Sequence, residues 1–139
     1  MTIATELLQR HLETFVDDNA QWQTLIADDL VWELPYGPTL GHPARLVGKQ
    51  EAVRHLAWFL GAVEKFRVSN VMLHAGADPE WAVAEFKAEA TAKPTGRTYH
   101  QDYVLFLRTA NGQIAFLREY FDPVRAATAF GAPIPGLEP

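Results

Sequence analysis

The chain has 139 residues, of which 48% are apolar and 21% charged, the size and balance of one globular domain that buries its own core. The formal net charge of −5 is spread along the chain without a stripe of Lys and Arg, which argues against nucleic acid or an anionic membrane surface as a partner. The absence of cysteine excludes disulfides, thiolate catalysis and thiolate metal sites.

Two helices are predicted before residue 28. Thr2 or Thr5 can cap a first helix that runs to about Phe15, and its apolar residues recur every three to four positions. One of the residues on this apolar face is His11. A turn at 17–19 separates this helix from a shorter one that extends to about Ala27.

A short strand, a long loop and a third helix are predicted next. The strand covers Leu30–Pro35, and the loop Tyr36–Val47 contains enough Gly and Pro to remain irregular and enough residues to cover a site. The helix runs from Gly48 to about Val63, with a buried stripe at helical spacing.

The second half of the chain alternates as strands do. Three long strands and a closing strand are predicted at Phe66–His74, Trp81–Thr91, Tyr99–Thr109 and Gln113–Asp122. Asn111-Gly112 supplies the positive φ angles that a tight hairpin turn needs. We expect no regular structure after Val124.

This order of elements predicts an α+β fold with helices on one face of a curved antiparallel sheet. A sheet curled around helices leaves an apolar cavity at one end, which is the default site for a small molecule. Residues 1–130 are expected to form one domain and residues 131–139 an irregular tail.

Several short motifs occur in a familiar order: Ala27-Asp28-Asp29, Trp32-Glu33-Leu34-Pro35, Gly48-Lys49-Gln50-Glu51-Ala52-Val53, Tyr99-His100-Gln101-Asp102-Tyr103 and Arg118-Glu119-Tyr120-Phe121-Asp122-Pro123. In these the chain resembles the SnoaL-like and ketosteroid isomerase-like branch of the nuclear transport factor 2-like superfamily, nearest to its phenazine biosynthesis members. The resemblance extends from Thr5 to about Phe130. It implies a cystatin-like, cone-shaped antiparallel sheet wrapped around three N-terminal helices, and a homodimer through the outer sheet face. This fold hosts many unrelated reactions, so the resemblance says less about chemistry.

The steroid isomerase catalytic set is not retained. The positions of its two aspartates match Leu34 and either Tyr103 or Val104, and the position of its tyrosine donor matches His11. The phenazine-type members resemble the chain more closely, and their pocket glutamate on the closing strand matches Glu119.

Glu119 and His11 are therefore the candidate catalytic residues. Side chains alternate across a strand, so Glu119 shares a face with Leu117 and Phe121. It is either an exposed acid on the convex face or a pocket carboxyl with a raised pKa that transfers a proton near neutrality. His11 is either a hydrogen-bonded core residue or a group for acid–base work and ligand orientation.

Glu85 has two possible placements. If the alanine-rich face of its strand receives the helices, Glu85 lies outside, and if that face forms a dimer surface, Glu85 lies in the cavity. Gln101 and Tyr103 share one face of the next strand and could offer an amide and a phenol to a ligand, or simply pack. The remaining candidates for ligand contact are Phe121, Trp32, Glu33 at the pocket rim or in solvent, and His42 and Arg45 in the long loop.

No metal or cofactor is predicted, because no pair of the five histidines has the spacing of a binding motif with a nearby carboxylate, and there is no phosphate-binding loop or nucleophile elbow. The favoured hypothesis is a cofactor-free isomerase, cyclase or dehydratase that acts on a small carbonyl or polyketide-like metabolite. The alternatives are a protein that binds a hydrophobic small ligand without turnover and a dimeric interaction domain. No leader or membrane span is evident, so we expect a cytoplasmic protein.

Overall fold

The computed structural model describes residues 1–137. In chain order its elements are α1 (Ile3–Thr14), α2 (Asn19–Leu25), β1 (Ile26–Glu33), the 3-10 helix η1 (Gly37–Leu40), β2 (Arg45–Val47), α3 (Lys49–Gly61), β3 (Val63–Ala75), β4 (Trp81–Ala92), β5 (Thr98–Ala110), β6 (Gln113–Tyr120) and α4 (Pro123–Phe130).

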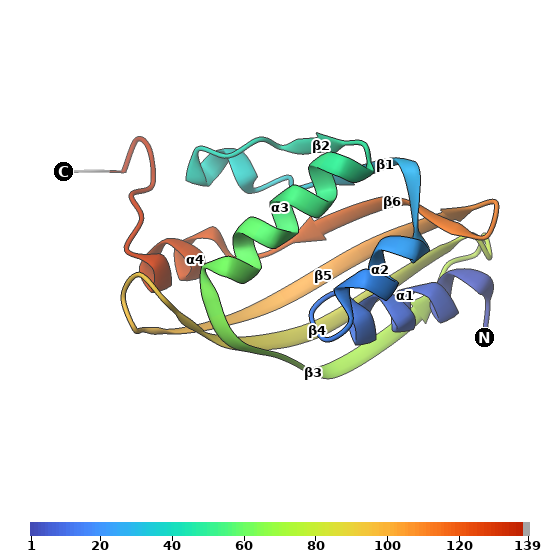
Figure 1. Cartoon of the computed structure of the whole chain (residues 1–139), viewed down its shortest axis with the longest axis horizontal. Helices are drawn as coiled ribbons and strands as arrows, with labels where there is room; N and C mark the ends of the chain where they lie inside the picture. The colour runs from blue at the N-terminus through green and yellow to red at the C-terminus, as the bar shows by residue number, and fades with distance from the viewer. Residues whose placement is uncertain (138–139) are drawn as a thin grey trace.

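All six strands form one sheet in the order β2-β1-β6-β5-β4-β3, and helices α1, α2 and α3 lie over one of its faces (Figure 1). Strands β3 to β6 form the predicted antiparallel meander. The pair β1–β6 is parallel, which differs from a wholly antiparallel sheet. A parallel pair needs a long connection, and residues 34–112 lie between these two strands. The α+β prediction with a curved sheet around N-terminal helices is confirmed.

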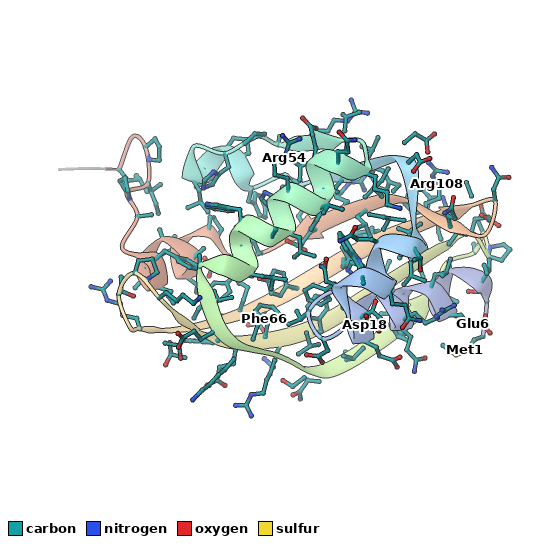
Figure 2. The ribbon with its side chains drawn as sticks, viewed as in Figure 1. Met1, Glu6, Asp18, Arg54, Phe66 and Arg108 are labelled. Atoms are coloured by element: carbon teal, nitrogen blue, oxygen red, sulfur yellow. The ribbon has the colours of Figure 1, made fainter. Side chains whose placement is uncertain are left out.

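The long edge strand β3 contains two irregularities that bend it. Its register to β4 shifts between Glu64 and Arg67 and again between Ser69 and Met72, and Lys65 and Asn70 within these shifts adopt positive φ angles of 56° and 54°. Such bulges increase local twist and bend the strand. Phe66 in the first of them belongs to the side chains between α3 and the sheet, whereas Arg54 lies on the outer side of α3 (Figure 2).

The inner face of β4 is made almost entirely of alanine. Alternate residues of this strand are buried, from Ala82 and Ala84 through Phe86 to Ala88, Ala90 and Ala92. Short side chains allow α1 to approach the strand closely, and buried apolar surface of this kind is the main stabilising contribution to the core. The first of the two placements considered for Glu85 is therefore observed.

The segment after β6 forms a helix where we expected irregular chain. Asp122 caps α4 by accepting hydrogen bonds from the backbone N–H of Val124 and Arg125 at 2.9 and 3.2 Å, and Pro123 occupies the first turn. Gly131, with a φ angle of 64°, ends the helix. The prediction of no regular structure after Val124 was wrong for this stretch. Residues 131–137 contain turns only, and residues 138 and 139 of the predicted tail lie outside the described residues.

Helix α4 is held at both ends. At its start, the side chain of Gln101 bonds the backbone N–H and C=O of Asp122, each at 2.9 Å. At its end, Thr95 and Arg97 of the β4–β5 turn donate to the carbonyl oxygens of Ala129 and Thr128. The helix therefore closes one end of the sheet as a fixed wall. Within residues 1–137, no helix has both the length and the apolar character needed to cross a membrane.

Candidate active site

A cavity of about 420 Å³ lies between the inner face of the sheet and the helices, near the end closed by α4. This volume lies in the range of sites for small organic ligands. Its wall combines residues from α1, β1, η1, α3, β4, β5, β6 and α4, and most of them are apolar. The side chains in the wall that carry a polar group are those of His11, Trp32, His42, His55, Trp58, Tyr99, Tyr103 and Glu119.

Glu119 is the acidic residue of this wall. It lies on the inner face of β6, opposite Leu105 of β5, and Leu117 and Phe121 flank it along its own strand. Its carboxyl retains some accessible surface, and because Glu119 lines the cavity, that surface faces the cavity. Burial among apolar neighbours raises its pKa to about 7, so the acid and the carboxylate are both populated near neutral pH. The pocket placement of the two considered from the sequence is the one observed.

His11 is brought to the same cavity by the C-terminal half of α1. Its Nδ1 accepts a hydrogen bond from Nε1 of Trp22 at 2.8 Å, and its ring stacks on Phe15 with a centroid distance of 5.3 Å and an interplanar angle of 8°. Burial lowers the pKa of His11 to about 4, so the imidazole is neutral at physiological pH. His11 is thus both a hydrogen-bonded buried residue and part of the cavity wall.

Two phenols from β5 form the wall beside Glu119. The hydroxyl groups of Tyr99 and Tyr103 are 2.7 Å apart, and the ring of Tyr103 stacks on Phe86. Burial raises the pKa of Tyr99 to about 12 and that of Tyr103 well above its usual value, so both remain protonated. Either phenol can donate to the other, which leaves one O–H of the pair available to a ligand.

Gln101 shares the inner face of β5 with these phenols, but its side chain bonds other groups of the protein and not the cavity. Besides its two bonds to Asp122, its amide donates to the hydroxyl of Tyr99 at 3.3 Å. The carbonyl and amide groups of this buried side chain are therefore occupied by the protein itself. The prediction of a ligand-binding amide is corrected to a support for Tyr99 and for the β6–α4 junction.

Aromatic rings gather where the loop after η1 meets α3. Trp58 contacts His42 and His55 at ring-centroid distances of 5.3 and 5.7 Å, and His55 meets Trp32 edge to face at 5.5 Å. Burial, and secondarily the nearby His42, lowers the pKa of His55. His55 was missed from the sequence, although its spacing of four residues from Phe59 on a helix indicates a shared face.

Three predicted contact residues lie away from the cavity, on the outer face or the edge of the sheet. Glu85 is half-exposed and pairs with His74 at 2.8 Å. Glu33 pairs with Arg118 at 2.9 Å and lies opposite the exposed Arg45 in the β1–β2 register. These placements correct the sequence-based expectation. The reason is strand parity, since Trp32 and Leu34 on either side of Glu33 point inward to the cavity.

Of the predicted site residues, the structure brings Glu119, His11, Tyr103, Phe121, Trp32 and His42 to one cavity. The chemistry they offer is proton transfer by a carboxyl group and hydrogen-bond donation by neutral imidazole, phenol and indole groups. Within residues 1–137, no three His, Cys, Asp or Glu side chains gather closely enough to hold a metal ion.

The chain is similar in sequence and in fold to several known proteins. The family model described as a SnoaL-like domain matches residues 8–117. The PhzA/B-like protein PA3332 of Pseudomonas aeruginosa, itself uncharacterized, is 32% identical over 129 residues, which cover 92% of this chain and 90% of that protein. A crystal structure of a candidate isomerase from Bacillus subtilis superposes with a TM-score of 0.85 at 26% identity, covering 95% of each chain. A phenazine biosynthesis-related protein of Pseudomonas aeruginosa shows the same fold, with a TM-score of 0.80 at 19% identity over 98% of this chain and 85% of its own.

Proposed function

Because this chain belongs to the SnoaL-like domain family, we propose that it is a cofactor-free enzyme that moves a proton within a small carbonyl compound, as an isomerase, a cyclase or a dehydratase. The observation that carries the proposal is Glu119, a carboxyl with a pKa of about 7 in the wall of an apolar cavity. A general acid or base works best when its pKa is close to the working pH.

The geometry supports a simple proton cycle. The carboxylate of Glu119 takes a proton from the carbon beside the ligand carbonyl, and the electrons of the C–H bond move toward the carbonyl oxygen. Donors such as His11 and the tyrosine pair stabilise the negative charge that develops on that oxygen. The protonated Glu119 then returns a proton to the ligand, so no oxidant or reductant is needed, and exchange of the carboxyl proton with solvent before this return places a solvent hydrogen on the ligand.

The destination of the proton distinguishes the three reactions. Return to another carbon is isomerisation. Return to a hydroxyl group that leaves as water is dehydration. If the activated carbon first attacks a second carbonyl of the same molecule, the proton goes to the new alkoxide and a ring has closed. A positioned acid–base group of this kind contributes about 10² to 10⁴ in rate.

The second candidate function is a binding protein that holds a hydrophobic small molecule without changing it. It is favoured by the hydrogen bonds among Tyr99, Tyr103 and Gln101, which use the Gln101 amide and one of the two phenol O–H groups within the protein. A third possibility, a domain that acts only through its sheet face, has less support because the interior contains an open cavity.

We also propose a homodimer through the outer face of the sheet. This face carries half-buried aromatic residues that contact one another, Trp81 with Phe116 and Phe106 with Tyr120, and the guanidinium of Arg118 lies over Phe106 and Phe116. Aromatic and arginine side chains are enriched in the centres of protein interfaces. Light scattering after size-exclusion chromatography should give twice the mass of the chain, whereas a monomeric mass at high concentration contradicts the proposal.

The catalytic proposal is tested by hydrogen exchange of a bound ketone. The protein is incubated in D₂O with neutral aromatic ketones such as 1-tetralone, first screened for binding by thermal shift. We expect wild-type protein to accelerate deuterium incorporation beside the carbonyl, Glu119→Gln to lose at least about 10² of that rate, and Glu85→Gln to match wild type. Exchange by Glu119→Gln at the wild-type rate contradicts the role of Glu119. Tight binding without exchange supports the binding protein instead.

A further inference from the structure

The hydrogen bond between Trp22 and His11 determines which nitrogen of the imidazole carries the proton. The indole nitrogen of tryptophan is a donor and never an acceptor. Nδ1 of His11, 2.8 Å from it, must therefore be the unprotonated, accepting nitrogen. In a neutral imidazole the proton then resides on Nε2.

The surroundings hold this arrangement in place. Trp22 is fully buried in α2, which packs against α1 (Figure 1), and its ring lies 6.1 Å from His11 and 6.5 Å from Trp32. The parallel stack with Phe15 keeps the imidazole from tilting. Rotation of the imidazole by a half-turn would leave a buried indole N–H without an acceptor, which is unfavourable.

Nε2 is the nitrogen of His11 that remains available to a ligand. Nε2 is separated from Nδ1 by one ring carbon and makes no hydrogen bond within residues 1–137, and His11 lines the cavity. Because Nδ1 is occupied and Nε2 is protonated, His11 offers the cavity a donor and no lone pair. It can orient and polarise an oxygen atom, but it cannot serve as the general base.

A second unpartnered donor lies in the same wall. The indole of Trp32 lines the cavity, is 4% exposed, and its Nε1 is buried without a hydrogen-bond partner in the described part of the chain. This nitrogen has almost no accessible surface, so a ligand acceptor reaches it only after a shift of the indole, and the donor presented to a ligand is the N–H of His11. The lining residues include no Lys or Arg, so a carboxylate entering the cavity would lose its hydration without gaining a fixed positive charge.

We propose that Trp22 is a positioning residue that holds His11 as a neutral Nε2–H donor, and that the cavity selects uncharged ligands with a carbonyl oxygen at this wall over carboxylates of similar shape. The selectivity part deepens the proposed function and rests on it, whereas the tautomer of His11 stands on the hydrogen bond alone. Trp22 touches no ligand in this scheme and acts only through His11.

The tautomer is tested first on the ligand-free protein. Long-range ¹H–¹⁵N spectra at pH 7 should show a pyridine-type Nδ1 and a pyrrole-type Nε2 for His11 in wild type and in the control Trp81→Phe, whose ring lies on the outer sheet face. In Trp22→Phe both nitrogens should shift toward a common averaged value. A protonated Nδ1 in wild type, or an unchanged spectrum in a folded Trp22→Phe, overturns the proposal.

Two further measurements keep the test decisive. If Trp22→Phe does not fold, a scalar coupling across the Trp22 N–H···Nδ1 bond in wild-type protein must still be present, and its absence overturns the assignment. Binding is then compared among 1-tetralone, its oxygen-free analogue tetralin and 1-naphthoate. We expect 1-tetralone to bind about 5- to 10-fold more tightly than tetralin, naphthoate to bind most weakly, and Trp22→Phe to erase only the advantage of the ketone.

Equal affinity for 1-tetralone and tetralin in wild type, or preference for naphthoate, overturns the selectivity. These outcomes are separate from those of the exchange experiment, since failure of deuterium exchange with 1-tetralone still bound as expected refutes turnover and leaves the role of Trp22 intact.

Discussion

The two faces of the same sheet give one residue type opposite surroundings. Glu119 lies near the end of β6 on its inner face, where Leu105, Leu117 and Phe121 remove water from around its carboxyl. Glu85 lies mid-strand on the outer face of β4, half-exposed and paired with His74. The face of the sheet on which the side chain lies thus separates a carboxyl whose pKa is raised to about 7 by burial from one that makes an exposed hydrogen bond to a histidine.

The polar groups of the two faces are also satisfied differently. On the outer face, Asp102 is paired with both Lys87 and Arg125 at the surface, where water and salt screen such interactions. On the inner face, Gln101 is fully buried and bonds the backbone N–H and C=O of Asp122 and the hydroxyl of Tyr99. Substitutions that exchange or remove these groups should therefore have very unequal effects.

The largest effect is expected for Gln101→Ala compared with its outer-face neighbour in Asp102→Ala. Removal of the buried amide leaves the N–H and C=O of Asp122 without partners and loosens the start of α4, which should lower the free energy of unfolding by about 3–5 kcal/mol. Loss of the exposed ion pairs in Asp102→Ala should cost less than about 1 kcal/mol. Urea denaturation of both variants provides the comparison, and similar losses in the two would contradict it.

The next effect concerns the dependence of stability on pH. Burial raises the pKa of Glu119 from 4.5 to about 7. At about 1.4 kcal/mol per pH unit, ionisation in the folded state costs about 3 kcal/mol, a penalty that is absent below pH 4.5 and develops fully as the pH rises through 7. Glu119→Gln cannot ionise, so between pH 5 and pH 9 it should gain about 3 kcal/mol of unfolding free energy relative to wild type.

Denaturation curves at these two pH values measure this change, and comparing one variant at two pH values cancels any constant cost of the amide. Glu85→Gln serves as the outer-face control and should track wild type at both. Parallel behaviour of wild type and Glu119→Gln across the range would show that the carboxyl is hydrated.

The smallest effect is expected for Glu33→Gln. Its carboxylate pairs with Arg118, and both side chains are about one third exposed. Removing the charge should lower the free energy of unfolding by less than about 1 kcal/mol, and added salt should shrink the difference further. Thermal unfolding at low and high salt measures it. A loss as large as that of Gln101→Ala would place Glu33 in a functional interior after all.

The sequence predicted helices α1 to α3 and the long strands well because periodicity, turns and the family resemblance agreed there, but η1 and β2 lie within the stretch 36–47 that we expected to be a loop. It was less informative about sites, since alternation separates two faces of a strand without saying which one meets the cavity. Glu33, with apolar neighbours on both sides, illustrates this. For α4, the Asp122-Pro123 start and the Gly131 stop were present in the sequence, but the helix between them has only 8 residues, too few for a helical period to stand out.

Periodicity also could not predict where along a strand the cavity lies. Gln101 and Tyr103 have the same parity, yet the phenol reaches the cavity and the amide is used at the β6–α4 junction. His55 was missed for a different reason. A lone polar residue on an amphipathic helix is expected at the edge of the apolar face, and the sequence does not show that a loop covers it.

Because helix α4 is held at both ends, the length of the cavity can change without a change in the positions of its polar groups. Ala126 and Ala127 form part of the wall from this helix, while the proton-transferring and donor groups are carried by the sheet and α1. A larger side chain at either alanine shortens the chamber from its far end without displacing Glu119 or His11. We therefore expect a substitution of Ala126 or Ala127 to change the length of ligand that the cavity admits while Glu119 and His11 keep their positions.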